Sequence, residues 1–261
     1  GTVITYRCIK CRNCKECKEH DQNEESSIRE EVEQDVINRS VEVDIINRVT
    51  TASLPFMHDA STKLVPNRDK AMKVYQQQLK KLAKNPKDKS DVINSEGKLQ
   101  ALGHVDYVSN LSVQQQEKLH NNKIQNYIPW RSVWKSSSLS TPCRVVFDAS
   151  QPTTSGYSLN SLLAKGRNNM NKLQEILLRW LTHYVAYHTG VQKMYNSIKL
   201  VETDWCYQRY IWEPNLDPDK PPQEKVIKTL IYGVKSSGNQ AEIGLRQTAK
   251  SSINEYPEIC D

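Results

Sequence analysis

The stretch AYHTGVQKMYN, residues 186–196, decides which fold this sequence predicts. It begins inside an apolar and aromatic run, residues 184–188, whose composition is that of a short buried strand. A short helix is expected to begin at Val191. Gly190 lies at the turn between the two elements. Because glycine has no side chain, this turn offers only its backbone to a ligand.

Further strands and helices are expected on both sides of this stretch. Residues 128–134 and 143–148 read as paired strands, residues 206–212 and 226–232 as two more, and residues 171–183 and 238–254 as helices. The Pro-rich residues 214–222 are expected to form a loop. This order of elements predicts an α+β fold, with a sheet that carries helices on one face.

The first half of the chain has a more helical pattern. Apolar residues at helical spacing predict a helix near residues 28–37, and further helices are expected at residues 70–83, 89–102 and 112–121. Gly103 is placed to end the second of these three helices. Residues 41–44 alternate like a short strand, and residues 50–56 read as extended chain.

Composition gives weaker information. The hydrophobic content is 37% and the mean hydropathy is −0.70, so a packed core is expected over only part of the 261 residues. All five Trp lie after residue 129, which places that core in the second half. The net charge of +6 is compatible with nucleic acid and equally with a solvated basic surface. No apolar run approaches the ~18 residues of a membrane span, and an intracellular location is expected.

Four cysteines recur every three residues near the N-terminus, and a histidine follows at the same interval: Cys8, Cys11, Cys14, Cys17 and His20. Two thiolates three residues apart can share one tetrahedral ion, so this set could hold Zn²⁺. An iron–sulfur cluster and the absence of a bound metal remain open alternatives. Cys143, Cys206 and Cys260 are scattered and read as buried thiols.

Three blocks of sequence carry a family resemblance. They are PCRVVFDAS at 142–150, TGVQKMYN at 189–196 and LIYGVKSSGNQA at 230–241. In order and spacing they resemble the fingers and palm of a reverse transcriptase, in wording close to the BEL/Pao class of LTR retrotransposon Pol polyproteins. SLN at 158–160 and GRNNMNKL at 166–173 resemble the same class. The resemblance is strong over residues 126–250 and looser over residues 1–125.

The resemblance also implies that the chemistry is missing. The family has a metal-binding aspartate where this chain has Gly190, and a Tyr-x-Asp-Asp hairpin is expected beyond the third block. These 261 residues contain no adjacent pair of aspartates. Mg²⁺ is the cofactor expected for the family, but its ligands are missing here. No residue of this chain is therefore predicted to be catalytic.

Binding residues are implied block by block. Arg144 would lie near an incoming triphosphate, the backbone N–H groups of Lys193 and Met194 would meet phosphates, and Tyr195 would pack under the sugar. The third block would contact template and primer through Gly233, Lys235, Ser237 and Gln240. The family has proline where this chain has Gly238, which would loosen the start of the following helix.

The sequence therefore predicts three segments. Residues 1–25 form a Cys-rich metal-binding segment, residues 26–125 a helical connecting region, and residues 126–261 a partial reverse-transcriptase fingers and palm. Both ends read as cuts from a longer chain. The predicted function is that of an inactive piece of an RNA-directed DNA polymerase, with a template–primer and other parts of the Pol polyprotein as partners. A non-catalytic nucleic-acid-binding module and a zinc-dependent interaction protein are the alternatives.

Overall fold

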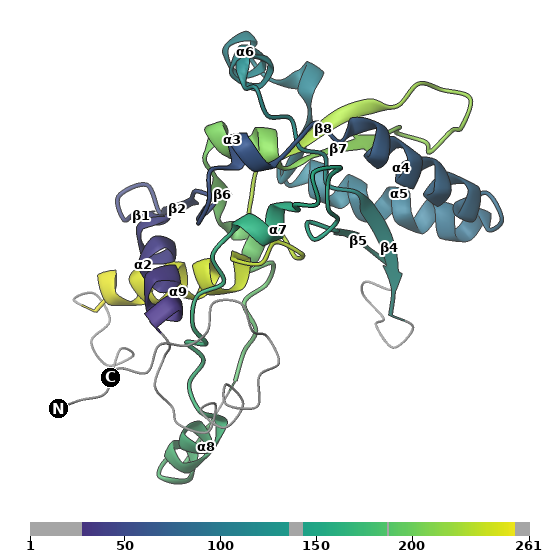
Figure 1. Ribbon diagram of the computed structural model, residues 1–261. Helices are drawn as coiled ribbons and strands as arrows, with labels where there is room; N and C mark the ends of the chain where they lie inside the picture. The colour runs from purple at the N-terminus through teal and green to yellow at the C-terminus, as the bar shows by residue number, and fades with distance from the viewer. Residues whose placement is uncertain (1–27, 136–142, 187, 254–261) are drawn as a thin grey trace, which may run out of the picture.

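The computed structural model describes residues 28–135, 143–186 and 188–253 (Figure 1). These residues form a mixture of helices and small sheets, as expected for an α+β protein. Three sheets lie within the described residues, in place of the one larger sheet predicted. No helix in this part of the chain is both long and apolar enough to cross a membrane.

The first sheet has the order β1-β2-β6, formed by β1 (Val41–Asp44), β2 (Val49–Ala52) and β6 (Lys199–Leu200). β1 and β2 pair antiparallel, and β6 pairs parallel to β2. Helices α2 (Ile28–Arg39) and α9 (Ser237–Ser251) pack beside this sheet and against each other (Figure 1). The first sheet therefore joins chain segments about 150 residues apart.

The second sheet has the order β3-β8-β7 and is antiparallel, with β3 (Val105–Tyr107), β8 (Gln223–Ile227) and β7 (Arg209–Trp212). The third sheet is the hairpin of β4 (Trp130–Trp134) and β5 (Cys143–Phe147). Helices α4 (Arg68–Leu82) and α5 (Pro86–Ala101) contact each other and these strands. Short helices α3 (Ala60–Lys63), α6 (Val113–Asn121) and α7 (Leu159–Leu162) cover connections, as do the 3-10 turns η2 (Val108–Asn110), η3 (Tyr195–Ser197) and η4 (Glu202–Tyr207).

Aromatic side chains form the centre of the core. The rings of Trp130 and Trp212 lie 4.9 Å apart, and those of Phe147 and Tyr210 lie 5.0 Å apart. The indole Nε1 of Trp130 donates to the carbonyl oxygen of Ile211 at 3.0 Å, which satisfies the polar atom of the buried ring.

The core is not confined to the second half of the chain, as the tryptophan distribution had suggested. Ile37 and Val92 from the first half are fully buried in it. The first two sheets each contain strands from both predicted segments, 26–125 and 126–261, so the described parts of these segments pack together. The boundary between the two segments stays a prediction.

Local patterns gave most of the elements correctly. The helices predicted at residues 70–83, 89–102 and 112–121 are α4, α5 and α6, and the strand predicted at residues 41–44 is β1. Gly103 ends α5 with a φ of +71°, the left-handed conformation that favours glycine. Ser112 begins α6 with a reciprocal capping box to Gln115.

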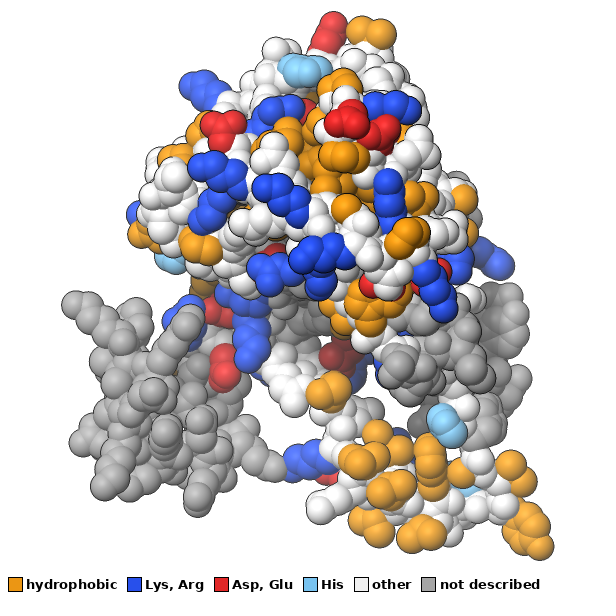
Figure 2. Space-filling view, turned by 90° about the vertical axis from the view of Figure 1, so that its right-hand side faces the viewer, with side chains coloured by type: hydrophobic (Ala, Val, Ile, Leu, Met, Phe, Trp, Pro, Cys, Tyr) orange, Lys and Arg blue, Asp and Glu red, His pale blue; other side chains and the backbone are white. Residues whose placement is uncertain are grey.

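The strand predicted at residues 184–188 is wrong. Residues 184–186 and 188 belong to no strand, and Tyr184 and Val185 are exposed. The preceding helix α8 (Leu173–Leu181) buries none of its residues, although its leucines fall on the predicted face. Figure 2 shows the apolar side chains of this region gathered on the surface. The composition of residues 184–188 favoured a strand, but within the described residues no neighbouring strand pairs with this segment.

Two other strands are shifted. β8 runs from Gln223 to Ile227 instead of residues 226–232, and residues 206 and 207 belong to η4 instead of β7. β7 was predicted to alternate between core and solvent, yet all four of its residues are buried. It pairs with β8 along its length, Arg209 bonds residues 126 and 128 on the other edge, and α4 packs against it, so the strand is enclosed by other parts of the chain.

Candidate functional site

Asn160 connects the first and third blocks of the resemblance. Its Nδ2 donates to the Ser150 hydroxyl at 2.8 Å and to the Gly233 carbonyl at 2.7 Å, and its Oδ1 accepts from the Lys235 N–H at 2.8 Å. The capping box of Ser158 and Ser161 places Asn160 in the first turn of α7. One amide therefore joins the end of β5 to the loop before α9.

Gly233 makes this junction tight. Its φ is +103°, and a β-carbon at this position would lie 2.0 Å from the carbonyl oxygen of Phe147. No other residue type fits such an approach without moving the backbone. Gly233 is therefore required by packing, and the template contact predicted for it stays a prediction.

Tyr195 and Asn196 bring the second block to the same place. The rings of Tyr195 and Tyr232 meet edge to face at a centroid distance of 4.4 Å. Asn196 Nδ2 donates to Thr229 Oγ1 at 3.2 Å and to the Leu230 carbonyl at 3.1 Å. Burial, and then the neighbouring Tyr232, raise the pKa of Tyr195. The Tyr195 hydroxyl also faces Gly238, where a β-carbon would lie 3.5 Å from it.

The phosphate site predicted at Lys193 and Met194 lacks the helix start on which that prediction was based. The segment after Val191 makes only a turn and then η3, which is three residues long. Lys193 has a φ of +53°, and Met194 packs against the core. A single 3-10 turn has too few aligned N–H groups to act as the start of a helix. The exposed side chain of Lys193 remains next to the tyrosine pair in sequence and contributes charge only.

Ser237 and Gln240 are also placed differently from the prediction. Both are buried, and Gln240 Nε2 donates to Ser40 Oγ at 2.8 Å and to the Ser53 carbonyl at 2.7 Å. These bonds attach α9 to the chain around β1 and β2. Neither side chain reaches the surface in this structure, so a contact with template or primer is not available to them.

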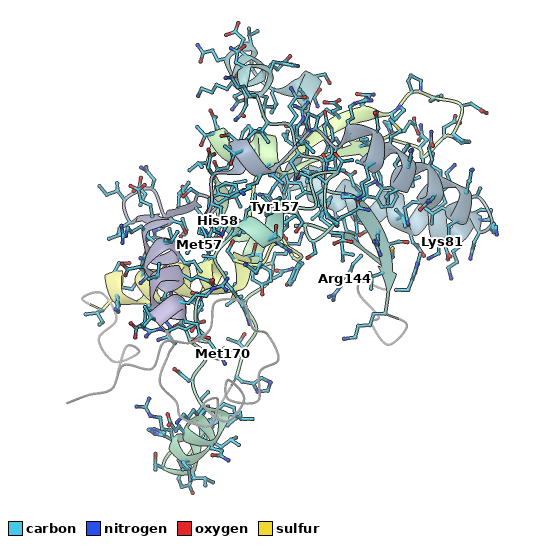
Figure 3. The ribbon with its side chains drawn as sticks, in the orientation of Figure 1. Met57, His58, Lys81, Arg144, Tyr157 and Met170 are labelled. Atoms are coloured by element: carbon cyan, nitrogen blue, oxygen red, sulfur yellow. The ribbon has the colours of Figure 1, made fainter. Side chains whose placement is uncertain are left out.

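Arg144 lies exposed on β5, opposite Val133 (Figure 3). The carboxylate of Asp148, at the end of the same strand, pairs with Arg131 at 2.9 Å. This exposed pair is expected to contribute little to stability. Arg144 is exposed, and the triphosphate contact predicted for it stays a prediction.

Gly190 lies in irregular chain, and a β-carbon there would meet no atom within 4 Å. Space for a carboxylate is present, but the residue that would supply it is not. Across residues 28–135, 143–186 and 188–253, no group of three or more His, Cys, Asp or Glu could hold a metal ion. Cys8, Cys11, Cys14, Cys17 and His20 lie outside the described residues, so the predicted zinc site stays a prediction.

Asp204 is a structural carboxylate that the sequence did not reveal. Its Oδ2 accepts the N–H of Leu54 at 2.6 Å, which attaches η4 to the chain after β2. Burial raises the pKa of this carboxyl group. Asn160 was likewise not predicted as a junction residue, although the Ser-x-x-Ser capping pattern around it could have indicated a fixed helix start.

Comparison with known proteins adds no family. No family model matches the chain, and no curated protein matches it at a significant level.

Proposed function

We propose that residues 126–253 are a reverse-transcriptase-like fingers and partial palm, similar to the BEL/Pao class, that binds nucleic acid without polymerising nucleotides. One observation carries this proposal: the three blocks of the resemblance, 40 to 90 residues apart in sequence, meet around Asn160 and Tyr195. A chance likeness of three short motifs would not be expected to converge on one junction.

The chemistry of polymerisation does not fit these residues. Phosphoryl transfer to a 3′-hydroxyl depends on metal ions held by carboxylates. Gly190 supplies none, and the chain has no adjacent aspartates. The expected Mg²⁺ therefore has no set of ligands here, and no catalytic step can be assigned to this chain.

What remains at the junction suits binding. Tyr232 is exposed, and its ring is held by Tyr195 from the side. An exposed, fixed aromatic ring can stack on a nucleobase, which contributes about 1–3 kcal/mol per base. Lys193 lies on the same segment as Tyr195 and adds positive charge for the phosphates. Stacking and positive charge bind nucleic acid of any base sequence, as a non-catalytic nucleic-acid-binding module requires.

The proposal is tested by binding and extension with one labelled primer–template. We expect salt-dependent binding by the unmodified chain and no extension with Mg²⁺ or Mn²⁺. Gly190→Asp alone will not restore extension, because the paired aspartates are still absent. Tyr232→Ala should weaken binding roughly 5- to 150-fold. Tyr184→Ala is the matched control, since Tyr184 is a fully exposed tyrosine that is not part of the Tyr195–Tyr232 pair.

Extension by the unmodified chain would overturn the inactive assignment. Equal loss of binding in Tyr232→Ala and Tyr184→Ala would remove the junction from the binding surface.

A further inference from the structure

The positive charge of this chain is concentrated in one short segment. Residues 70–89 contain seven lysines and a single acidic residue, Asp88. The other 241 residues contain 29 basic and 29 acidic residues, so this segment carries the whole net charge of +6. A solvated surface of average composition would not collect its charge in this way.

The structure places these lysines along the outer side of one helical hairpin. Five of them are exposed, on α4, the connecting turn and the first turn of α5: Lys73, Lys80, Lys81, Lys84 and Lys87, here called the lysine ridge. None of the five forms an ion pair with any residue that the structure describes. Figure 2 faces this end of the molecule and shows basic side chains outnumbering acidic ones across its upper part, and Figure 3 labels Lys81 near the end of α4.

Helix stability accounts for only part of this arrangement. Lys80 and Lys81 lie in the last turn of α4, where positive charge is favourable. Lys87 lies in the first turn of α5, where the helix dipole disfavours a cation. Lys84 lies in the turn two residues beyond the end of α4, close in sequence to Lys80 and Lys81, and like charges that lie close together repel. The ridge therefore carries unneutralised charge that costs stability, and a bound polyanion would relieve that repulsion.

We propose that the lysine ridge binds the phosphate backbone of a nucleic-acid strand. Lys73 and Lys80 fall on one face of α4, about 10 Å apart along the helix axis, and Lys84 follows in the turn after the helix. At 3.4 Å per nucleotide along one strand, the spacing between Lys73 and Lys80 corresponds to about three nucleotides. Lysine acts as a point charge, so contacts of this kind hold phosphates and do not read bases.

Other anionic partners fit the surface less well. A helix that lies on a membrane presents an apolar face to the lipid. The apolar residues of α4 are turned into the core and are buried: Ala71, Tyr75, Leu79 and Leu82. The glutamines Gln76 and Gln77 lie exposed among the lysines and can hydrogen-bond sugar and phosphate oxygens. The lysine ridge is separate in sequence from the junction around Asn160 and Tyr195. It would therefore be a second surface that contacts nucleic acid, and this inference partly rests on the proposed function.

The test compares two full-length variants that lose the same charge. The ridge variant carries Lys73→Gln, Lys80→Gln, Lys81→Gln and Lys84→Gln. The control carries Lys123→Gln, Lys199→Gln, Lys220→Gln and Lys250→Gln, all exposed and outside the ridge. Binding to labelled 20-nucleotide DNA and RNA strands is measured by fluorescence anisotropy over a series of salt concentrations. The slope of log K against log salt should fall by about 3 in the ridge variant, near 0.7 per lysine, and by less than about 1 in the control.

Further arms separate the explanations. A ridge variant with four Lys→Arg changes should keep its affinity, and urea unfolding should show that each variant is folded. Equal losses in ridge and control variants would overturn the proposal, because net charge alone would then explain binding. Tighter binding of polyglutamate or of anionic lipid vesicles than of either oligonucleotide would also overturn it. If Tyr232→Ala loses affinity and the ridge variant does not, the ridge is rejected as a binding surface and the proposed function stands. If only the ridge variant loses affinity, the junction is rejected as a binding surface.

Discussion

Gly233 approaches Phe147 so closely that a β-carbon on Gly233 would lie 2.0 Å from the Phe147 carbonyl oxygen. The contact joins the end of β5 to the loop before α9 and fixes the place where the three sequence blocks meet. Backbone atoms on both sides form the contact, so it cannot relax by rotating a side chain.

Gly233→Ala should lower the free energy of unfolding by about 2 kcal/mol or more, because it adds a backbone clash to an unfavourable φ. Urea unfolding measures the change. Gly190→Ala is the matched control, since a β-carbon there meets nothing within 4 Å, and its effect should stay within about 0.5 kcal/mol. Equal stability of the two variants would contradict the close approach.

Asn160→Ala should destabilise the protein by about 1–3 kcal/mol, because it removes the amide that bonds Ser150, Gly233 and Lys235. It should also weaken binding to the primer–template, since the loop that carries Tyr232 loses its attachment. Asn215→Ala provides the comparison, as Asn215 is exposed and its side chain makes no hydrogen bond within the described residues. The prediction fails if both variants unfold at the same urea concentration.

Glu96 and Lys225 form a buried ion pair, and the Tyr210 hydroxyl donates to the same carboxylate at 2.6 Å. Burial lowers the pKa of Lys225, while Glu96 opposes that shift. Glu96→Gln should cost about 3–5 kcal/mol, because it leaves a buried ammonium without a counter-charge. The double variant Glu96→Gln/Lys225→Met should recover much of that loss. If the double variant is no more stable than the single one, the pair is not the source of the effect.

Stability should fall at alkaline pH. Burial raises the pKa of Tyr127 to about 12 from an ordinary value of 10.0, so its contribution is complete below pH 10 and is lost as the pH rises from 10 to 12. Tyr107 and Tyr207, each with a pKa raised to about 12 by burial, act in the same direction. The lowered pKa of Lys225 acts oppositely below about pH 10.5. Tyr127→Phe should reduce the slope of unfolding free energy against pH by up to about 1.4 kcal/mol per unit. An unchanged slope would mean that Tyr127 titrates normally.

Hydrogen exchange should divide the chain unevenly. β7 pairs with β8 along its length, all four of its residues are buried, and the Arg209 carbonyl also accepts from the Ile128 N–H at 2.7 Å on the other edge, so its amides should exchange slowly. Residues 184–186 and 188–192 lie outside any helix or strand and are exposed, so they should exchange within seconds. Mass spectrometry of peptic peptides resolves the two regions. Slow exchange at residues 184–186 would restore the strand predicted there.

Short-range patterns determined much of this fold. The apolar spacing of α4, the caps of α5 and α6 and the pairing of β4 with β5 all depend on residues close in sequence, so the sequence alone predicts them. The order of the three blocks was also visible without a structure. The sequence alone also shows that no carboxylate is present at position 190, because this residue is glycine.

Tertiary structure decided the rest, because burial depends on partners distant in the chain. Residues 184–188 have the composition of a strand. Residues 184–186 and 188, which the structure describes, pair with no strand that could accept their hydrogen bonds. Gln240 and Lys225 are polar residues that composition places at the surface, yet each is buried by partners more than 100 residues away. The ridge lysines on α4 are exposed for the same kind of reason, because the opposite face of this helix packs against the core.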